Sequence, residues 1–256
     1  MPQPLILVSN DDGITSYGIK TLVEIMTQLG EVVVVAPDSP QSGQGHAITV
    51  DHLLRLKKTD VFGDQVAAYE CSGTPSDCVK LAKHHVLRDR TPDLVVSGIN
   101  HGSNSSISVL YSGTMSAAIE GAIEGLPAIG FSLGDFARKP DFSHVRDYIL
   151  QIAQNVMSKG IPKGTALNVN FPAKSENPLK GVKICRQGDG FWKEHFDVRK
   201  DPHGRNYFWL DGGFVNRDSG EDSDLWALEN NYVSIVPCQY DLTAYGAMKQ
   251  LQNWNL

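Results

Sequence analysis

Two adjacent carboxylates, Asp11 and Asp12, are the residues of this chain whose types and spacing most directly suggest chemistry. They stand in LILVSNDDGIT, residues 5–15, directly after a run of aliphatic side chains. Such a run is typical of a buried strand, so the two acids lie where a strand leaves the core. Neighbouring like charges repel, and an unpaired buried carboxylate is costly. Water, a basic partner or a metal cation can offset that cost.

Two other polar segments follow apolar runs in the same way. PDSPQSGQGH, residues 37–46, follows EVVVVA, and SGINHGSN, residues 97–104, ends the run DLVVSG. Parallel strands would bring all three segments to one edge of a sheet. Their potential ligands are oxygen atoms of carboxylates, Ser and Asn side chains and backbone carbonyls, with no Cys or His cluster. This set disfavours zinc and favours Mg²⁺ or Mn²⁺.

A candidate anion site follows the third segment. Ser112, Gly113 and Thr114 open the small-residue stretch GTMSAAIEGAIEG, which is predicted to be a helix. The first N–H groups of a helix and its positive dipole end attract anions, and the two hydroxyls add donors. A metal site beside an anion site indicates phosphoester chemistry.

Each feature also has a purely structural interpretation. Asp-Asp-Gly is a common turn or helix cap, Ser42 could lie in a surface loop, and Asn100 could form a turn. Ser112 could simply cap a helix, and His101 could be a loop histidine. The Gly-x-Gly at 43–45 lacks the third glycine of a dinucleotide fingerprint, and no P-loop motif occurs. The functional interpretation therefore depends on the convergence of the three segments.

The elements that must position these residues alternate between strands and helices. The apolar pattern predicts strands over 4–9, 31–36, 93–98, 127–134, 166–172 and 232–238, and helices over 19–29, 75–87, 113–125, 143–160 and 243–252. This alternation predicts a doubly wound, mostly parallel, three-layer α/β fold of the Rossmann-like kind. We expect a single domain over 1–256, with a core of about 1–175 and an extension of about 176–256.

The extension has a different texture. Residues 181–218 are aromatic, charged and Gly-rich, which predicts antiparallel strands and a hairpin. Its aromatic side chains within 189–217 are Phe191, Trp192, Phe196, Tyr207, Phe208, Trp209 and Phe214. A lone hairpin cannot bury so much apolar surface, which predicts association into a dimer or larger closed oligomer.

Composition narrows the class of partner. The net charge of −6 argues against a nucleic-acid polymer, for which a basic excess is expected. No segment approaches the roughly 18 uninterrupted apolar residues of a membrane span, and the N-terminus lacks the features of a signal peptide. The cysteines show no paired spacing: they are Cys71, Cys78, Cys185 and Cys238. We expect reduced thiols and a cytoplasmic location.

Taken together and in order, these motifs resemble the SurE family, the stationary-phase survival proteins with 5′-nucleotidase activity. The matching segments are ILVSNDDG (6–13), APD and QSG within 36–43, CSGTPSDCV (71–79), DLVVSGIN and Asn104 within 93–104, YSGTMSAAIEG (111–121), and YVSIVP with DLT within 232–243. The resemblance covers nearly the whole chain.

The resemblance implies a site and a substrate. It implies one divalent ion per subunit, Mg²⁺ or Mn²⁺, held by Asp11, Asp12, Ser42 and Asn100. It also implies a phosphate pocket lined by Asn104, Ser112, Gly113 and Thr114. The implied substrate is a nucleoside 5′-monophosphate, and 3′-nucleotides and short polyphosphate remain open as further substrates. The implied assembly is a homodimer or homotetramer joined through the extension.

Two departures from the family pattern flank this pocket. Many members carry Arg after the Pro-Asp of the second loop, where this chain has Ser39, and many have Ala-Pro-Gly where this chain has Ser16-Tyr17-Gly18. Neither change replaces an expected ligand, but both could alter which substrate is accepted.

The expected reaction is hydrolysis of a phosphomonoester by a metal-activated water, with Asp11 or Asp12 orienting or deprotonating it. Asn104 and the start of the 113–125 helix would hold the phosphoryl oxygens. His101 is a candidate for the general acid. Three alternatives remain at this point. The first is an aspartyl-phosphate phosphatase of the haloacid-dehalogenase type, although such enzymes use an Asp-x-Asp spacing and this chain has adjacent aspartates. The others are a nucleotide-binding regulator without turnover and a structural subunit with a degenerate site.

Overall fold

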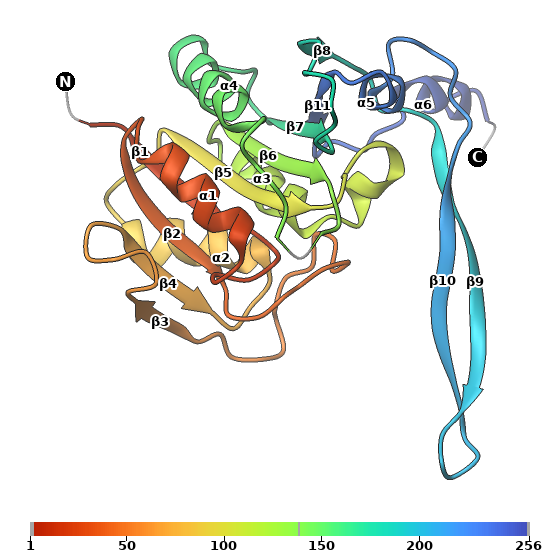
Figure 1. Cartoon of the computed structure of the whole chain (residues 1–256), viewed down its shortest axis with the longest axis horizontal. Coiled ribbons are helices and arrows are strands. Elements are labelled where there is room, and N and C mark those ends of the chain that lie inside the picture. Colours follow the sequence, from red (N-terminus) through yellow and green to blue (C-terminus); the bar gives the residue numbers. More distant parts are fainter. Residues whose placement is uncertain (1–2, 138, 255–256) are drawn as a thin grey trace.

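A nine-stranded, mostly parallel sheet forms the centre of the computed structural model, which describes residues 3–137 and 139–254 (Figure 1). The strands in spatial order are β3 (Leu56–Thr59), β4 (Ala67–Cys71), β2 (Glu31–Pro37), β1 (Leu5–Ser9), β5 (Leu94–His101), β6 (Ala128–Gly134), β7 (Thr165–Pro172), β11 (Val233–Gln239) and β8 (Val182–Ile184). β1 is central, with Val8 opposite Val34 of β2 and Ser9 opposite Ser97 of β5. The carboxyl ends of these strands therefore meet at one edge.

Helices cover both faces of this sheet. The helical elements in chain order are α1 (Tyr17–Met26), α2 (Pro75–Leu81), the π-helical turn η1 (Ala82–Leu87), the 3-10 turn η2 (Ser106–Leu110), α3 (Gly113–Ile123), α4 (Arg146–Lys159), α5 (Asp224–Glu229) and α6 (Tyr245–Leu251). The helices α1 and α4 pack together on one face, and α2 and α3 pack together on the other. The predicted three-layer α/β arrangement is confirmed.

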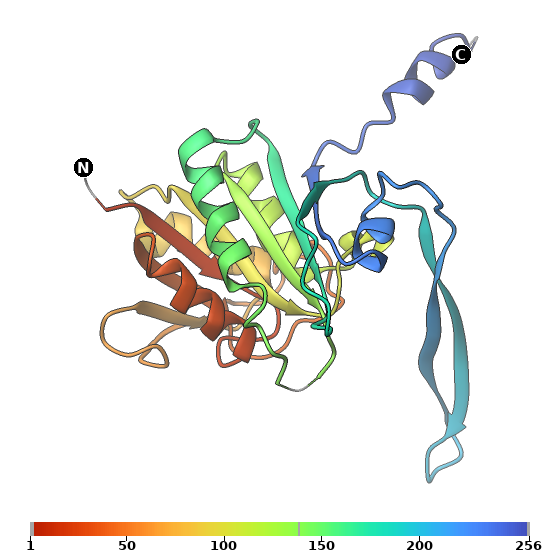
Figure 2. The ribbon, with the colours of Figure 1, turned by 45° about the horizontal axis from the view of Figure 1, so that its top comes forward.

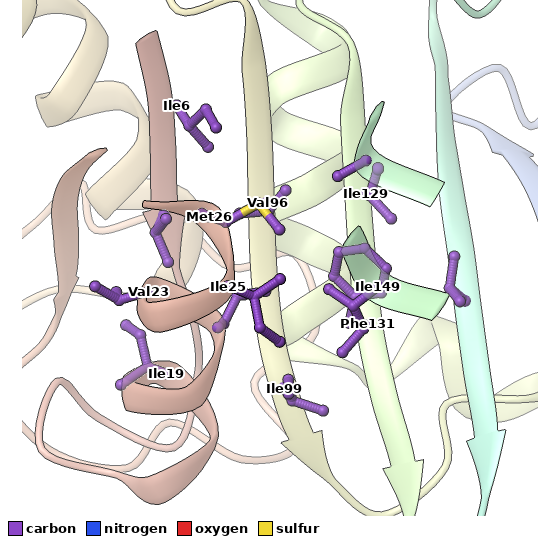
Figure 3. Packing of buried hydrophobic residues seen from close by; sticks show 14 of the residues in the cluster. Ile6, Ile19, Val23, Ile25, Met26, Val96, Ile99, Ile129, Phe131 and Ile149 are labelled. Carbon is purple, nitrogen blue, oxygen red and sulfur yellow. The ribbon is translucent and has the colours of Figure 1, made fainter. Parts of the chain in front are cut away.

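The larger core lies between the sheet and the layer of α1 and α4. Figure 3 shows Ile25 and Met26 of α1 against Val96 of β5, with Phe131 of β6 close to Ile149 of α4. These side chains are almost fully buried. At roughly 1.5–3 kcal/mol for each large apolar side chain, their burial holds α1 and α4 firmly on the sheet. The strand ends that carry the polar segments are thereby fixed in place.

The element boundaries differ from the expectations in several places. The helix predicted over 75–87 continues only to Leu81 as an α-helix and then widens into η1. The strands β3 and β4 and the helix α5 were not predicted, because they are short and carry mixed polar and apolar residues. Among the strands, β11 pairs antiparallel with β7, and β3 pairs antiparallel with β4.

The predicted hairpin is confirmed and projects from the body. Strands β9 (Gly190–Lys200) and β10 (Asn206–Asn216) form a separate antiparallel pair that extends far from the sheet in both views (Figures 1 and 2). The C-terminal helix α6 also stands clear of the sheet in Figure 2. Within the described residues, no helix is long and apolar enough to cross a membrane.

Candidate active site

Asp11 is buried at the beginning of α3. Its side chain is only 4% exposed, and its Oδ1 atom accepts a hydrogen bond of 2.5 Å from Oγ1 of Thr114. The nearby backbone N–H groups of Gly113 and Thr114 also lower the pKa of this carboxyl group. A Cβ atom on Gly113 would lie 2.6 Å from Cβ of Asp11, so only glycine permits this approach. A carboxylate of the chain itself therefore lies close to this helix start.

Asp12 lies beside it and is less buried. The pKa of Asp12 is raised to about 6, mainly by burial and then by the neighbouring charge of Asp11, while the charge and the backbone N–H of His101 act in the opposite direction. Burial also raises the pKa of Asp11, although its hydrogen bonds oppose the shift. Both carboxyl groups therefore resist ionisation in the absence of a cation.

This donor set fits an oxygen-preferring divalent cation. A cation between the two carboxylates would offset their repulsion and lower both pKa values. Next to them, the buried Oδ1 atom of Asn10 accepts no hydrogen bond from residues 3–137 and 139–254. In the same ranges no group of three or more His, Cys, Asp and Glu side chains could hold a metal ion. The expected site uses two carboxylates and neutral oxygens, so it does not require such a group.

The structure brings the Ser42 loop to the same edge. The backbone N–H of Gln41 donates to the carbonyl oxygen of Asp11 at 2.7 Å, and that of Gly45 donates to Tyr111 at 3.2 Å. Ser42 lies between these two anchors in an exposed turn. Asn100 is half-buried at the end of β5, where its Nδ2 donates to the carbonyl of Gly102 at 2.9 Å. The predicted convergence of three segments is therefore present in the backbone.

The sequence alone did not reveal the residues that hold the C-terminal end of the Ser42 loop in place. Nε2 of His46 lies 2.8 Å from the buried carboxylate of Glu120 on α3, and Nζ of Lys80 lies 2.6 Å from the same carboxylate. Thr49 is held through its N–H and hydroxyl by Asp77 at 3.0 and 2.6 Å. The capping box of α2 and a buried glutamate thus hold the segment that carries Ser42.

Asn104 belongs to a buried amide network. Its Nδ2 donates to the hydroxyl of Ser132 at 2.8 Å, and its backbone N–H donates to Oδ1 of Asn170 at 2.7 Å. Asn168 donates to the carbonyl of Asn104 at 2.9 Å. The polar alternation in NVN, residues 168–170, was the sequence feature that could have revealed this partner. The side chain of Asn104 is thus oriented by β6, while its backbone is held by β7.

Ser112 and His101 have local partners as well. Ser112 caps α3, because its hydroxyl accepts from the N–H of Met115 at 3.0 Å. The ring of His101 packs edge to face against Phe136, with 6.3 Å between the ring centres, and its Nε2 contacts the carbonyl oxygen of Ala137. His101 also borders a cavity of about 260 Å³ that reaches Asp12. It therefore lies beside the carboxylate pair.

Comparisons with known proteins identify the family of this chain. The family model described as "Survival protein SurE" matches residues 6–194. The chain is 67% identical over 255 residues to the 5′-nucleotidase SurE of Cytophaga hutchinsonii, covering 99% of this chain and 98% of the relative. It is 57% identical over 256 residues to the protein of the same name from Flavobacterium psychrophilum, covering 100% and 99%. The crystal structure of the SurE protein from Aquifex aeolicus superposes with a TM-score of 0.82 at 40% identity, covering 97% of this chain and 98% of that one.

Proposed function

Because this chain belongs to the SurE family of phosphoric monoester hydrolases, we propose that it hydrolyses nucleoside 5′-monophosphates to nucleoside and phosphate with the help of a divalent metal ion. We include 3′-nucleotides and short polyphosphate as substrates to be tested. The observation that carries the proposal is the pair of adjacent acids with raised pKa values, of which Asp11 is buried against the start of α3 and Asp12 is half-buried beside it.

The two acids have different roles in this proposal. Asp11 is buried and accepts a hydrogen bond from the Thr114 hydroxyl, so it is a fixed anchor. Asp12 is the more accessible of the two, and it orients the attacking water and accepts its proton. The residues that hold the cation are Asp11, Asp12, Ser42 and Asn100. When bound, Mg²⁺ or Mn²⁺ polarises a phosphate oxygen and acidifies water.

The phosphoryl oxygens are held by a second group of residues. We assign this role to Asn104, Ser112, Gly113 and Thr114, which lie at the end of the third polar segment and at the start of α3. The orientation of Asn104 is supported by its bond to Ser132, which leaves one N–H of its amide for a ligand. Donors that are fixed before the reaction stabilise developing charge without reorganisation.

Phosphate release tests this proposal directly. Purified protein is incubated with AMP or GMP and Mn²⁺, then with an excess of chelator, and then with the metal restored. We expect turnover only when the metal is present. Binding of AMP without turnover under every metal condition would instead indicate a nucleotide-binding regulator. A panel of substrates with Mg²⁺, Mn²⁺, Co²⁺ and Zn²⁺ defines the base and metal preferences.

We also propose that the chain assembles as a homodimer or homotetramer through residues 176–256, with the whole chain acting as one domain. The hairpin supports this, because Phe196, Phe208 and Trp209 are 63%, 59% and 60% exposed on strands that extend away from the body (Figure 2). Large exposed apolar surfaces usually mark interfaces. A cytoplasmic location is consistent with the free thiols of all four cysteines.

A further inference from the structure

The cavity beside Asp12 has the size and position of a subsite for part of a nucleotide. Its volume is about 260 Å³, which is below the roughly 300–1,000 Å³ of pockets that enclose a complete drug-sized ligand. Its lining includes Asp12, Ser16, Tyr17, His101, Pro140 and Phe142. The cavity is therefore lined both by the expected catalytic acid Asp12 and by aromatic side chains.

Two aromatic rings at this cavity are accessible to a ligand. Tyr17 is 50% exposed, and His101 is half-buried with its ring packed edge to face against Phe136, which is 76% exposed. The Nζ atom of Lys139 lies 5.4 Å from the centre of the Tyr17 ring. A contact of this kind at an exposed site is worth only about 0.5–1 kcal/mol, so a better stacking partner can displace the lysine.

The backbone under Tyr17 is held in a fixed position. Tyr17 is the first residue of α1, and Ser16 before it accepts a hydrogen bond of 2.9 Å from Nδ2 of Asn10. A Cβ atom on the following residue, Gly18, would collide with the carbonyl oxygen of Ile99, so the start of α1 lies directly on the end of β5. A ring attached at this point can act as a rigid platform.

We propose that this cavity holds the nucleobase of the substrate, stacked on Tyr17, and that Tyr17 selects nucleotides over phosphate esters that lack a base. The inference rests on the proposed function. In a nucleoside monophosphate only the ribose separates the phosphate from the base, and the cavity directly adjoins Asp12. Aromatic side chains bind bases through their π-faces, which all bases possess.

The sharpest variant is Tyr17→Pro. Proline is favoured at the first position of a helix, where its missing N–H has no intrahelical partner. The preceding Ser16 already has the extended conformation that a following proline requires, with φ −64° and ψ 158°. The variant therefore removes the ring and preserves α1. Tyr17→Phe is the matched control, because it keeps the ring and loses only the hydroxyl.

The test compares AMP with ribose 5-phosphate, which has the same sugar phosphate but no base. We expect Tyr17→Pro to raise the KM for AMP and the inhibition constant of adenosine about tenfold, as for the loss of one base–aromatic stack. Turnover of ribose 5-phosphate and inhibition by inorganic phosphate should stay unchanged, and Tyr17→Phe should behave like the wild type. An equal loss for AMP and ribose 5-phosphate, or no loss for either, would overturn the base subsite.

Failure of the proposed function gives a different result. If the wild type releases no phosphate from either compound with Mn²⁺ present, the hydrolase proposal is wrong for this chain. Equilibrium dialysis with adenosine then tests base binding in the cavity independently of turnover. Binding that is lost in Tyr17→Pro and kept in Tyr17→Phe would support the platform, whereas equal binding by all three proteins, or none, would overturn it.

Discussion

The edge of the sheet around Asp11 and the hairpin of β9 and β10 depart from ordinary burial in opposite directions. At the sheet edge, Asp11 and Thr114 are polar but 4% and 0% exposed. In the hairpin, Phe196 and Trp209 are apolar but about 60% exposed. Folding alone favours neither arrangement, since buried carboxyls and exposed aromatic side chains both cost free energy.

The difference shows what each region lacks in the isolated chain. Buried carboxyls with raised pKa values are stabilised by a cation, and exposed apolar strands are stabilised by another protein surface. The first region is rigid, because α3 and the strand ends hold it from several sides, whereas the second is a two-stranded ribbon supported at its base. Mutations in the two regions should therefore affect different measurements: metal binding and turnover for the sheet edge, and association for the hairpin.

The largest effect is expected from Asp12→Asn. The substitution keeps the size of the side chain and removes the charge that the cation and the attacking water require. Loss of a residue that only hydrogen-bonds to a metal ligand typically costs about 10- to 100-fold in activity. Because Asp12 is expected to be a ligand itself, metal-dependent phosphate release should fall by more than about 10²-fold. The exposed loop substitution Asp64→Asn is the control, and circular dichroism checks the fold. Activity near that of the wild type would remove Asp12 from the metal site.

Thr114→Val should cost roughly 10- to 100-fold in turnover at limiting Mn²⁺, because the Thr114 hydroxyl orients Asp11. Thr114→Ser keeps the hydroxyl and should retain most of the activity. The measurement is the Mn²⁺ concentration that gives half-maximal activity, together with the inhibition constant of vanadate. A higher metal requirement is expected if the hydroxyl acts through Asp11. A change confined to vanadate inhibition would show that the hydroxyl serves the phosphate site alone and has no effect through Asp11.

A substitution in the hairpin should affect association of the subunits. Trp209→Glu introduces a charge into the exposed apolar surface, and loss of one buried aromatic anchor at an interface costs about 2 kcal/mol or more, close to 30-fold in the dissociation constant. Light scattering over a range of concentrations measures the association. Gln65→Glu adds the same charge to an exposed loop of the body as a control. A wild-type protein that stays monomeric at micromolar concentration would contradict an interface at the hairpin.

The pH dependence of metal binding should report the carboxylate pair. The pKa of Asp12 in the folded chain is raised to about 6 from an ordinary value near 3.8, so protonation stabilises the metal-free fold. That contribution is fully present below about 3.8 and is lost as the pH rises through 6. A cation must displace the proton, so Mn²⁺ affinity should fall at least about tenfold for each pH unit below 6. Constant affinity between pH 5 and 7 would contradict this.

The sequence could predict the region of the site but not its internal contacts. The central strands were predictable because they are continuous apolar runs, and the polar segments after them identified the correct edge. The bond between Asp11 and Thr114 joins residues 103 positions apart, so no local pattern contains it. The edge strand β3 is short and exposed, with the sequence LKKT, and only its pairing with β4 makes it a strand. Tertiary contacts decide such elements.

The smallest effect is expected for the influence of a hairpin substitution on turnover at the sheet edge. The hairpin meets the body at its base, where the Ser106 hydroxyl donates to the carbonyl of Gly188 at 2.7 Å and the Trp192 indole donates to Ser108 at 3.3 Å. These residues of η2 lead directly to Ser112, so the base of the hairpin touches the segment that positions α3. Trp209 lies farther along the ribbon, opposite Asp197.

Trp209→Glu should therefore change AMP turnover per subunit by less than about twofold, even where it weakens association. The measurement is turnover at protein concentrations above and below the dissociation constant of the assembly. A twofold limit corresponds to about 0.4 kcal/mol, which is within the range of surface substitutions away from special features. A tenfold loss of turnover that is restored at high protein concentration would contradict the separation, because it would mean that a neighbouring subunit's hairpin completes the site.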